Sequence, residues 1–220
     1  MIDFDKLIDN HLAKEFRPKI IGRYYPSEIA NCLRKTWFSY KIPKPLDTKV
    51  IKIFQIGNML HEFVTNVLKN EKNKEIEFVK SEIPIEVKID DFIIAGRVDN
   101  LVLVKLNEIN QVRYVLVEVK STKVLPEKHK KEHEAQLQFY MQVLGITKGI
   151  ILYIQKDNLE TRAFNIDYNK ELAEIILERF RELHRCLLFN KLPRAEAKQD
   201  KEKQWMCSFC AWKEECEKIR

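Results

Sequence analysis

The stretch Gly96–Lys120 reads GRVDNLVLVKLNEINQVRYVLVEVK, two apolar runs on either side of a polar segment at Asn107–Gln111. Val-rich runs separated by a polar turn predict two strands paired as a hairpin. Each run carries one acid, Asp99 in the first and Glu118 near the end of the second. Because the two acids come from paired strands, we expect them to lie beside each other on one face of the sheet.

The residues that follow Glu118 extend this pattern. Side chains two apart share a strand face, so Lys120 points the same way as Glu118 and Val119 points into the core. Two carboxylates and an ammonium on an apolar sheet are costly without a partner, and Mg²⁺ or Mn²⁺ is the simplest partner. Lys120 would then orient a water or offset a developing negative charge. The alternative is a surface hairpin whose exposed face carries three ordinary charged residues.

Repulsion between the two acids affects how their replacement changes the stability of the fold. Carboxylates clustered on one face repel each other when no metal is bound. We therefore expect Asp99→Ala and Glu118→Ala to leave the fold intact or more stable while they abolish activity.

Length and charge limit the class of protein. The 220 residues fit one folded domain with a substantial core, and the net charge of +6 permits a polyanionic partner. No uncharged apolar run approaches the length of a membrane span, and the acidic N-terminus lacks the basic region of a secretory signal. We expect a cytoplasmic protein without a membrane partner, and the sequence leaves the oligomeric state open.

The order of helical and strand patterns predicts an α/β fold, a mixed sheet flanked by helices. We expect one domain with a helical N-terminal part (1–70), a core (71–192) and a C-terminal cysteine segment (193–220). Helices are expected over 2–15, from Pro26 with Ser27 as N-cap to Pro43, over 48–69 with Thr48 as cap, from after Pro126 to Leu144, and over 168–190; strands are expected over 76–89, 92–106, 111–121, 149–155 and 160–166. Residues 193–203 are polar without periodicity, which indicates a linker or mobile loop.

The five cysteines favour a metal site over disulfides. An odd number without a secretory signal argues against a disulfide framework, whereas Cys207, Cys210 and Cys216 form a closely spaced C-x2-C-x5-C set. Cys32, expected within the second helix, would supply a fourth thiolate, and the long loop so closed indicates a structural role. Four thiolates suit zinc or an iron–sulfur cluster equally well. Cys186 lies on an apolar helix face and is interpreted as a core residue.

Two helices carry further candidates. His61 lies on the helix over 48–69, where it is either a packing residue or a metal ligand, and Gly57 one turn earlier would allow a close approach. Gln136 and Tyr140 lie four apart on one helix face. Either Tyr140 is core and Gln136 is surface, or both project beside the acids to position water or contact a phosphate.

A run of lysines precedes the Gln136 helix: Lys123, Lys128, Lys130 and Lys131. It is either a solvated face or the contact for a phosphodiester backbone. No G-x-x-x-x-G-K-[ST] loop is present, so the chain contains no P-loop ATPase motif.

In this order, the motifs resemble the RecB-like branch of the PD-(D/E)XK nuclease superfamily. They are His61, the Gly96-Arg97-Val98-Asp99 and Glu118-Val119-Lys120 segments, and Gln136-x3-Tyr140. The cysteine arrangement, one before these motifs and three after, is similar to that of the CRISPR-associated Cas4 exonucleases, as is the segment Tyr24–Lys35, YYPSEIANCLRK. Val98 stands where the superfamily name has proline, a departure that is common in this branch.

The resemblance implies a restriction-endonuclease-like core and assigns a separate role to each group of motif residues. It implies a [4Fe-4S] cluster on Cys32, Cys207, Cys210 and Cys216; Mn²⁺ or Mg²⁺ on His61, Asp99, Glu118 and the Val119 carbonyl; and catalysis by Lys120 with Gln136 and Tyr140. The activity it implies is exonucleolytic cleavage of single-stranded DNA or overhangs, commonly from the 5′ end. The cellular role it implies is trimming of spacer precursors with the CRISPR integrase.

Two other functions remain open at this point. One is a stand-alone or viral RecB-like nuclease of DNA repair or replication, which would share the chemistry. The other is a non-catalytic DNA-binding subunit with a zinc site, against which the complete Asp99–Glu118–Lys120 set argues.

Overall fold

The computed structural model describes residues 2–13, 16–70, 76–106, 111–201 and 203–219. The turn expected at Asn107–Gln111 therefore lies almost wholly outside the described residues. In chain order the helices are α1 (Phe4–Leu12), α2 (Pro26–Ile29), α3 (Leu33–Lys41), α4 (Thr48–Asn70), α5 (Lys131–Leu144), α6 (Lys170–Leu188), α7 (Glu196–Gln199), α8 (Trp205–Ser208) and α9 (Lys213–Lys218). The strands are β1 (Arg23–Tyr24), β2 (Ile76–Ile89), β3 (Phe92–Leu106), β4 (Gln111–Thr122), β5 (Lys148–Gln155) and β6 (Thr161–Asp167).

The strands form one mixed sheet, as the sequence predicts. Its order is β1-β3-β4-β5-β6, and β2 also pairs with β3. β3 is antiparallel to β2 and β4, β4 is parallel to β5, and β5 is antiparallel to β6. The parallel crossover from β4 to β5 runs through α5, and this helix contacts β4, the strand that carries Glu118 and Lys120.

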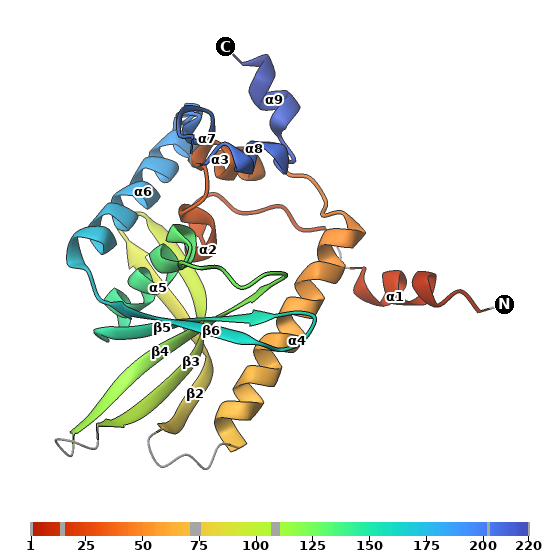
Figure 1. Ribbon diagram of the computed structural model, residues 1–220. Helices are drawn as coiled ribbons and strands as arrows, with labels where there is room; N and C mark the ends of the chain where they lie inside the picture. Colours follow the sequence, from red (N-terminus) through yellow and green to blue (C-terminus); the bar gives the residue numbers. More distant parts are fainter. Residues whose placement is uncertain (1, 14–15, 71–75, 107–110, 202, 220) are drawn as a thin grey trace.

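Helices cover both faces of this sheet (Figure 1). α4 packs Leu60 and Val64 onto one face, against Val102, Val117 and Val119. α2, α3, α5 and α6 pack onto the other face in the larger core, whose fully buried side chains include Ile29, Leu33, Leu137, Phe139 and Phe180. Val119 is fully buried, as expected from its place between Glu118 and Lys120.

The helix expected from Pro26 to Pro43 is two helices. Tyr25 is the N-cap and Pro26 the first residue of α2, so the expected Ser27 cap is wrong. The side-chain amide of Asn31 donates to the Ser27 carbonyl, and a side chain that bonds nearby backbone competes with helix continuation. Cys32 consequently lies at the N-cap of α3, outside the helix in which it was expected.

The segment 193–203 is packed rather than a free linker. It contains α7, and Ala195 and Ala197 are buried. The Glu196 carboxylate accepts from both terminal guanidinium nitrogens of Arg179 on α6, and from the main-chain N–H of Leu33. A polar sequence without periodicity conceals this packing, because the buried members are small alanines between charged residues.

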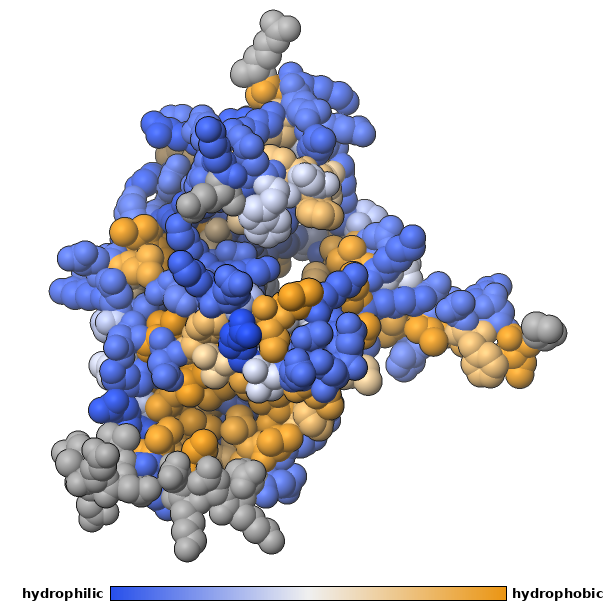
Figure 2. Space-filling model, viewed as in Figure 1, coloured by the Kyte–Doolittle hydropathy of each residue, from blue (hydrophilic) through white to orange (hydrophobic). Residues whose placement is uncertain are grey.

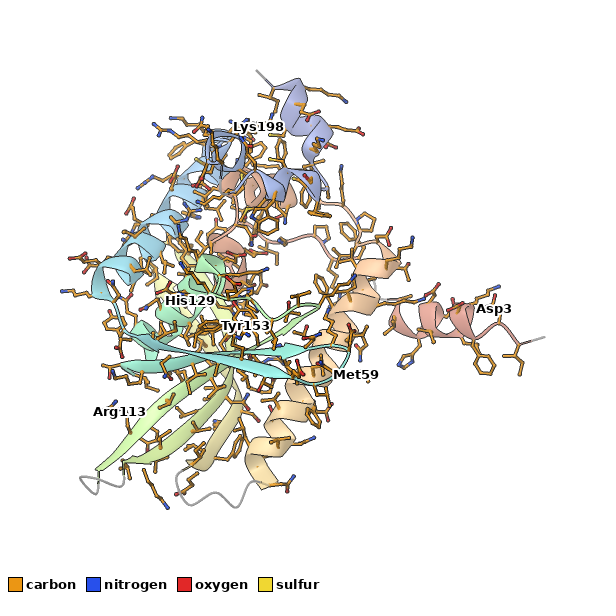
Figure 3. The ribbon with its side chains drawn as sticks, in the orientation of Figure 1. Asp3, Met59, Arg113, His129, Tyr153 and Lys198 are labelled. Carbon is orange, nitrogen blue, oxygen red and sulfur yellow. The ribbon has the colours of Figure 1, made fainter. Side chains whose placement is uncertain are left out.

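The start of α4 differs in detail from expectation, and α1 projects from the molecule. The Asp47 carboxylate, rather than Thr48, accepts from the main-chain N–H of Lys49 and caps α4. α1 has no buried residue and extends away from the body, with Asp3 near its tip (Figures 1 and 3). Phe4 and Leu7 of this helix are exposed. Figure 2 shows hydrophobic surface along the projecting arm. None of the described helices combines the length and apolar character needed to cross a membrane.

Candidate active site

Asp99 and Glu118 lie level with each other at the point where the β3–β4 ladder ends. Asn100 and Val117 are the last paired residues of that ladder, and the two acids are the next residues along. Oδ2 of Asp99 accepts a hydrogen bond from the main-chain N–H of Val119 at 2.8 Å. Both acids are buried, Asp99 at 8% exposure and Glu118 at 1%. The hairpin thus places two carboxylates together below the surface.

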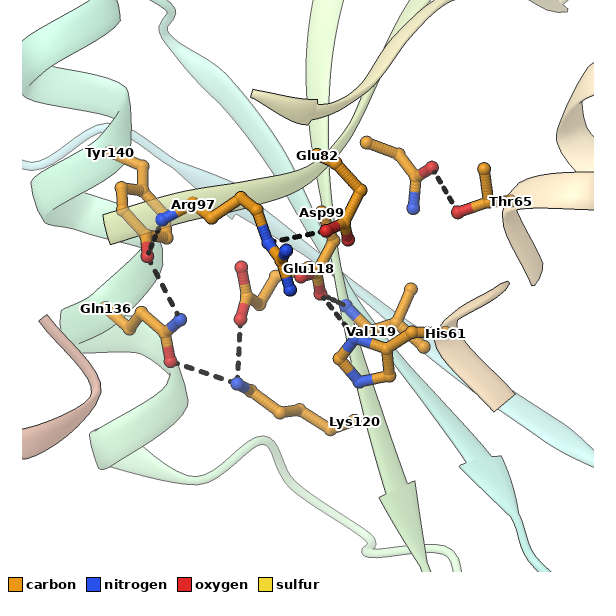
Figure 4. A network of polar contacts seen from close by, with 11 residues as sticks. His61, Thr65, Glu82, Arg97, Asp99, Glu118, Val119, Lys120, Gln136 and Tyr140 are labelled. Atoms are coloured by element: carbon orange, nitrogen blue, oxygen red, sulfur yellow. Dashed lines mark hydrogen bonds and ion pairs between the residues drawn. The ribbon is translucent and has the colours of Figure 1, made fainter. Parts of the chain in front are cut away.

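Lys120 joins the acids to helix α5 (Figure 4). Its Nζ lies 2.7 Å from Oε1 of Glu118 and 3.0 Å from Oε1 of Gln136. Nε2 of Gln136 donates to Oη of Tyr140 at 3.4 Å. Gln136 and Tyr140 are both buried, which excludes the surface position considered for Gln136. One face of α5 therefore fixes the ammonium beside the carboxylates.

His61 approaches the acids from α4, on the opposite side of the site. Its Nδ1 lies 3.4 Å from Oδ2 of Asp99. One turn further along α4, Oγ1 of Thr65 donates to Oδ1 of the fully buried Asn100 at 2.8 Å, which ties the helix to β3. A Cβ on Gly57 would lie 3.5 Å from Oγ of Ser121, an ordinary van der Waals contact, so the described protein atoms leave room for a small side chain there.

Burial and the neighbouring charges shift the protonation of this cluster. Burial raises the pKa of Glu118 to about 7; the Lys120 charge opposes this shift and the Asp99 charge adds to it. Burial alone would lower the pKa of Lys120, but the charge of Glu118 and its hydrogen bond raise it. Burial likewise opposes a charged His61, yet contact with Asp99 raises its pKa. The lysine is therefore cationic in the physiological range.

The donor set fits a hard divalent cation. Oε2 of Glu118 is buried and has no hydrogen-bond partner among the described residues, so one carboxylate oxygen remains available as a ligand. Carboxylate oxygens and an imidazole suit Mg²⁺ or Mn²⁺. In the part of the chain that the structure describes, no three His, Cys, Asp or Glu side chains converge closely enough to form a preorganised metal site.

Four of the five cysteines line one pocket of about 310 Å³ between α3 and the C-terminal helices: Cys32, Cys207, Cys210 and Cys216. All four are free thiols. Burial raises the pKa of Cys207, and the other three thiols raise it further because they lie near enough to repel its charge. They too fall short of a preorganised metal group among the described residues. Cys186 does not line this pocket and is buried in the main core, as expected.

The lysine run follows the site strand. All four of its lysines, Lys123, Lys128, Lys130 and Lys131, are exposed on the connection between β4 and α5 or at the start of α5. Nζ of Lys130 also lies over the ring of Trp205, 5.8 Å from its centroid. These positions agree with either interpretation of the run.

The sequence indicated no role for several residues around the site. Oη of Tyr153, which is level with Lys120 on β5, accepts from the main-chain N–H of Lys130 and bonds Nδ1 of His133 at 2.8 Å. Arg97, two residues before Asp99, pairs with Glu82 of β2. The short distance from Arg97 to Asp99 in the sequence was a usable signal for Arg97. No local signal marks Glu82, because its contact depends on the β2–β3 register.

The model of the PD-(D/E)XK nuclease superfamily matches residues 24–217, almost the whole chain and every element of the site. The chain belongs to the PD-(D/E)XK nuclease superfamily. The expected fold and the expectation of a nuclease are therefore confirmed. Nucleases of this superfamily use divalent metal ions such as Mg²⁺ or Mn²⁺, in agreement with the donor set around Glu118.

Known PD-(D/E)XK relatives include exonucleases. The chain is 26% identical over 215 residues to the CRISPR-associated exonuclease Cas4 of Saccharolobus solfataricus, covering 96% of this chain and 94% of that protein. The solved structure of SSO0001 superposes with a TM-score of 0.60 at 20% identity, covering 94% of this chain and 90% of the other. LHK-Exo of Laribacter hongkongensis, solved in complex with dAMP, gives a TM-score of 0.51 at 16% identity, covering 82% and 96%.

Proposed function

We propose that this protein is a metal-dependent DNA exonuclease that acts on single-stranded ends or overhangs. The observation that carries this proposal is the position of Lys120, whose ammonium is held by Glu118 and Gln136 at the end of a buried acid pair. An ammonium in this position can offset the negative charge that develops on the phosphate during phosphodiester hydrolysis, which a purely structural lysine does not do. The similarity to an exonuclease named Cas4 supports the same assignment.

Four groups would hold Mg²⁺ or Mn²⁺: the side chains of His61, Asp99 and Glu118 and the carbonyl of Val119. When bound, the ion supplies positive charge against the phosphate and its attacking water. Oε2 of Glu118, which has no hydrogen-bond partner among the described residues, is suited to this task. Asp99 also keeps its bond to Val119, which holds β3 and β4 in register at the site.

The chain's own residues provide orientation and a fixed positive charge. Lys120 would donate to the attacking water and offset the charge that develops on the phosphate. Gln136 accepts from the same ammonium and restricts where it points, and Tyr140 accepts from Gln136 in turn. Glu118 raises the pKa of Lys120, which favours the charged ammonium that this role needs.

We further propose that Cys32, Cys207, Cys210 and Cys216 hold a [4Fe-4S] cluster with a structural role. Their shared pocket and the mutual influence of their thiols support this ligand set. The cluster would connect the start of α3 to the C-terminal helices within a single domain, residues 1–220. The donor chemistry also suits zinc, so metal analysis is the deciding measurement.

The finer biological assignment rests on the Cas4 likeness alone. We propose cleavage in the 5′ to 3′ direction, trimming of spacer precursors together with the CRISPR integrase, and action in the cytoplasm. Lys123, Lys128, Lys130 and Lys131 would contact the DNA backbone, which their exposure on the β4–α5 connection supports.

The test uses single-stranded DNA labelled at the 5′ end or the 3′ end, incubated with Mn²⁺. Wild type should release the label in a pattern that reports polarity, whereas Lys120→Ala and Glu118→Gln should lose cleavage. Lys88→Ala, an exposed lysine on β2, is the matched control and should cleave like wild type. Unchanged cleavage by Lys120→Ala and Glu118→Gln would contradict the proposed site.

A further inference from the structure

The ion pair between Arg97 and Glu82 lies beside the site and has no role in the proposed chemistry. Nε of Arg97 lies 2.5 Å from Oε2 of Glu82, and Figure 4 shows the pair next to Asp99. The side chains of Arg97 and Glu82 are 64% and 45% exposed. The guanidinium is thus an accessible cation beside a site that is otherwise rich in carboxylates.

The backbone of Arg97 belongs to the same hydrogen-bonded network as Lys120. Its main-chain N–H donates to Oη of Tyr140 at 3.3 Å, and Tyr140 accepts from Gln136. Gly96 allows this close packing, because a Cβ there would lie 2.8 Å from Oη of Tyr140. The base of the Arg97 side chain is therefore held in place relative to Lys120, while its guanidinium faces solvent.

Glu82 reaches Arg97 from an unusual backbone position. Its neighbours Ser81 and Ile83 pair with Asn100 and Val98, so Glu82 is level with Asp99 across β2 and β3. Its φ of 54° lies in the left-handed region, which residues with a Cβ rarely adopt. The carboxylate of Glu82 thus stands level with the acid pair, on the neighbouring strand.

A guanidinium recognises carboxylate and phosphate oxygens through the same planar set of donors. An ion pair as exposed as this one contributes little to stability, so an incoming phosphate can displace the carboxylate. We propose that Arg97 binds a backbone phosphate of the DNA strand next to the scissile one, and that Glu82 occupies the position of that phosphate until DNA arrives. This inference rests on the proposed nuclease function.

The proposal predicts a gain in DNA affinity when Glu82 is replaced, whereas a purely structural role for the ion pair does not. If Glu82 competes with DNA, Glu82→Gln frees the guanidinium and removes a negative charge from the path of the strand. Affinity for DNA should then rise. If the pair only stabilises the β2–β3 hairpin, the same change leaves affinity unchanged or lowers it.

The experiment measures binding of a fluorescein-labelled oligothymidine by anisotropy in EDTA, where cleavage does not interfere. Arg97→Gln should weaken binding about fivefold to tenfold and reduce the slope of log K against log salt by about 0.7. Glu82→Gln should tighten binding about threefold, and so should Glu82→Asn, which tolerates the left-handed backbone better. The double variant Arg97→Gln/Glu82→Gln should lose the gain.

The matched control is Glu86, which is also exposed on β2 and pairs with Arg23 at 2.8 Å. Glu86→Gln should leave affinity close to the wild-type value, so a gain confined to Glu82 is not a general effect of lower negative charge. With Mn²⁺ present, Arg97→Gln should raise KM and leave kcat nearly unchanged. The KM of Arg97→Lys should lie between those of wild type and Arg97→Gln.

Two results separate this inference from the nuclease proposal. If wild type cleaves and binds DNA but neither Glu82 variant tightens binding, the phosphate-mimic role of Glu82 is overturned and the nuclease stands. If wild type neither cleaves nor binds the oligonucleotide, the proposed function itself fails, and the role of Arg97 fails with it.

Discussion

The main-chain N–H of Val119 donates to Oδ2 of Asp99 at 2.8 Å, just beyond the last paired residues of β3 and β4. The same carboxylate that is a candidate metal ligand is thus also a structural acceptor. Asp99 satisfies a buried main-chain donor at the end of a sheet ladder. Its removal consequently affects both the chemistry and the fold.

This bond revises the expectation that Asp99→Ala is harmless to the fold. Alanine leaves the Val119 N–H without its acceptor, at a cost of about 1–3 kcal/mol, whereas Asp99→Asn keeps an oxygen in that position. We expect both variants to lose cleavage and only Asp99→Ala to melt clearly below wild type, by about 2–4 °C per kcal/mol. Thermal melts beside cleavage assays check this. Equal melting of the two variants would contradict the structural role.

Gly96 is the glycine next to the site where a side chain has no room. A Cβ would lie 2.8 Å from Oη of Tyr140 and 3.2 Å from Cδ of Pro26. Gly96→Ala should therefore cost about 1–3 kcal/mol by overpacking and lower kcat, because Tyr140 and Gln136 shift together. Denaturant unfolding and steady-state cleavage measure the two effects.

Gly57→Ala provides the control for this substitution. Gly57 lies within α4, and beyond its own helix its Cβ would meet only Oγ of Ser121, at 3.5 Å, among the described residues. Alanine in a helix interior is about 0.5–1 kcal/mol more favourable than glycine, so this variant should be as stable as wild type or more so, with cleavage retained. A loss of stability as large as that of Gly96→Ala would show that the steric argument is wrong.

The cysteines divide into one pocket set and one core residue. We expect anaerobically purified protein to be brown and to contain iron, and Cys210→Ser to lose iron and melt at a lower temperature. Cys186→Ser changes a buried thiol on α6 outside the pocket and should keep the iron content unchanged. Stoichiometric zinc without iron would refute the cluster and leave the fold assignment intact, and iron loss in Cys186→Ser would refute the ligand assignment.

The Arg179–Glu196 pair gives stability a pH dependence. Burial alone would raise the pKa of Glu196, but the hydrogen bonds and charge of Arg179 outweigh it, so the folded-state pKa is lowered. A lowered pKa means that the unfolded state binds more protons, so this stabilisation is present above the ordinary carboxyl pKa and is lost as the pH falls below it.

We therefore expect Glu196→Gln to melt about 2–4 °C below wild type at neutral pH, for a loss of about 1 kcal/mol from a partly exposed pair. The difference should shrink as the pH falls below the ordinary glutamate pKa. Melting curves recorded from pH 7 downwards check this. Glu174→Gln, an exposed acid on the same helix α6 as Arg179, is the control and should show no such trend. A gap independent of pH would contradict the assignment to charge.

The sequence by itself determined the strands that carry the site and the side on which their residues point. Strand patterns over 76–89, 92–106 and 111–121 require only the two-residue period of a strand. That period placed Glu118 and Lys120 on one face and Val119 in the core, where it is buried. The C-x2-C-x5-C spacing likewise brought three cysteines together without knowledge of the fold. These are properties of neighbouring residues, which local backbone geometry controls.

Only the tertiary structure decided which distant side chains meet. The contact of Gln136 with Lys120 depends on how α5 crosses β4, and that of Glu82 with Arg97 depends on the β2–β3 register. The packing of Ala197 depends on Cys32 at the start of α3 and on Met206 of α8. The break before Cys32 interrupts a pattern that alone favoured one continuous helix. Such contacts are set by the packing of whole elements, so they become visible only when helices and strands are assembled.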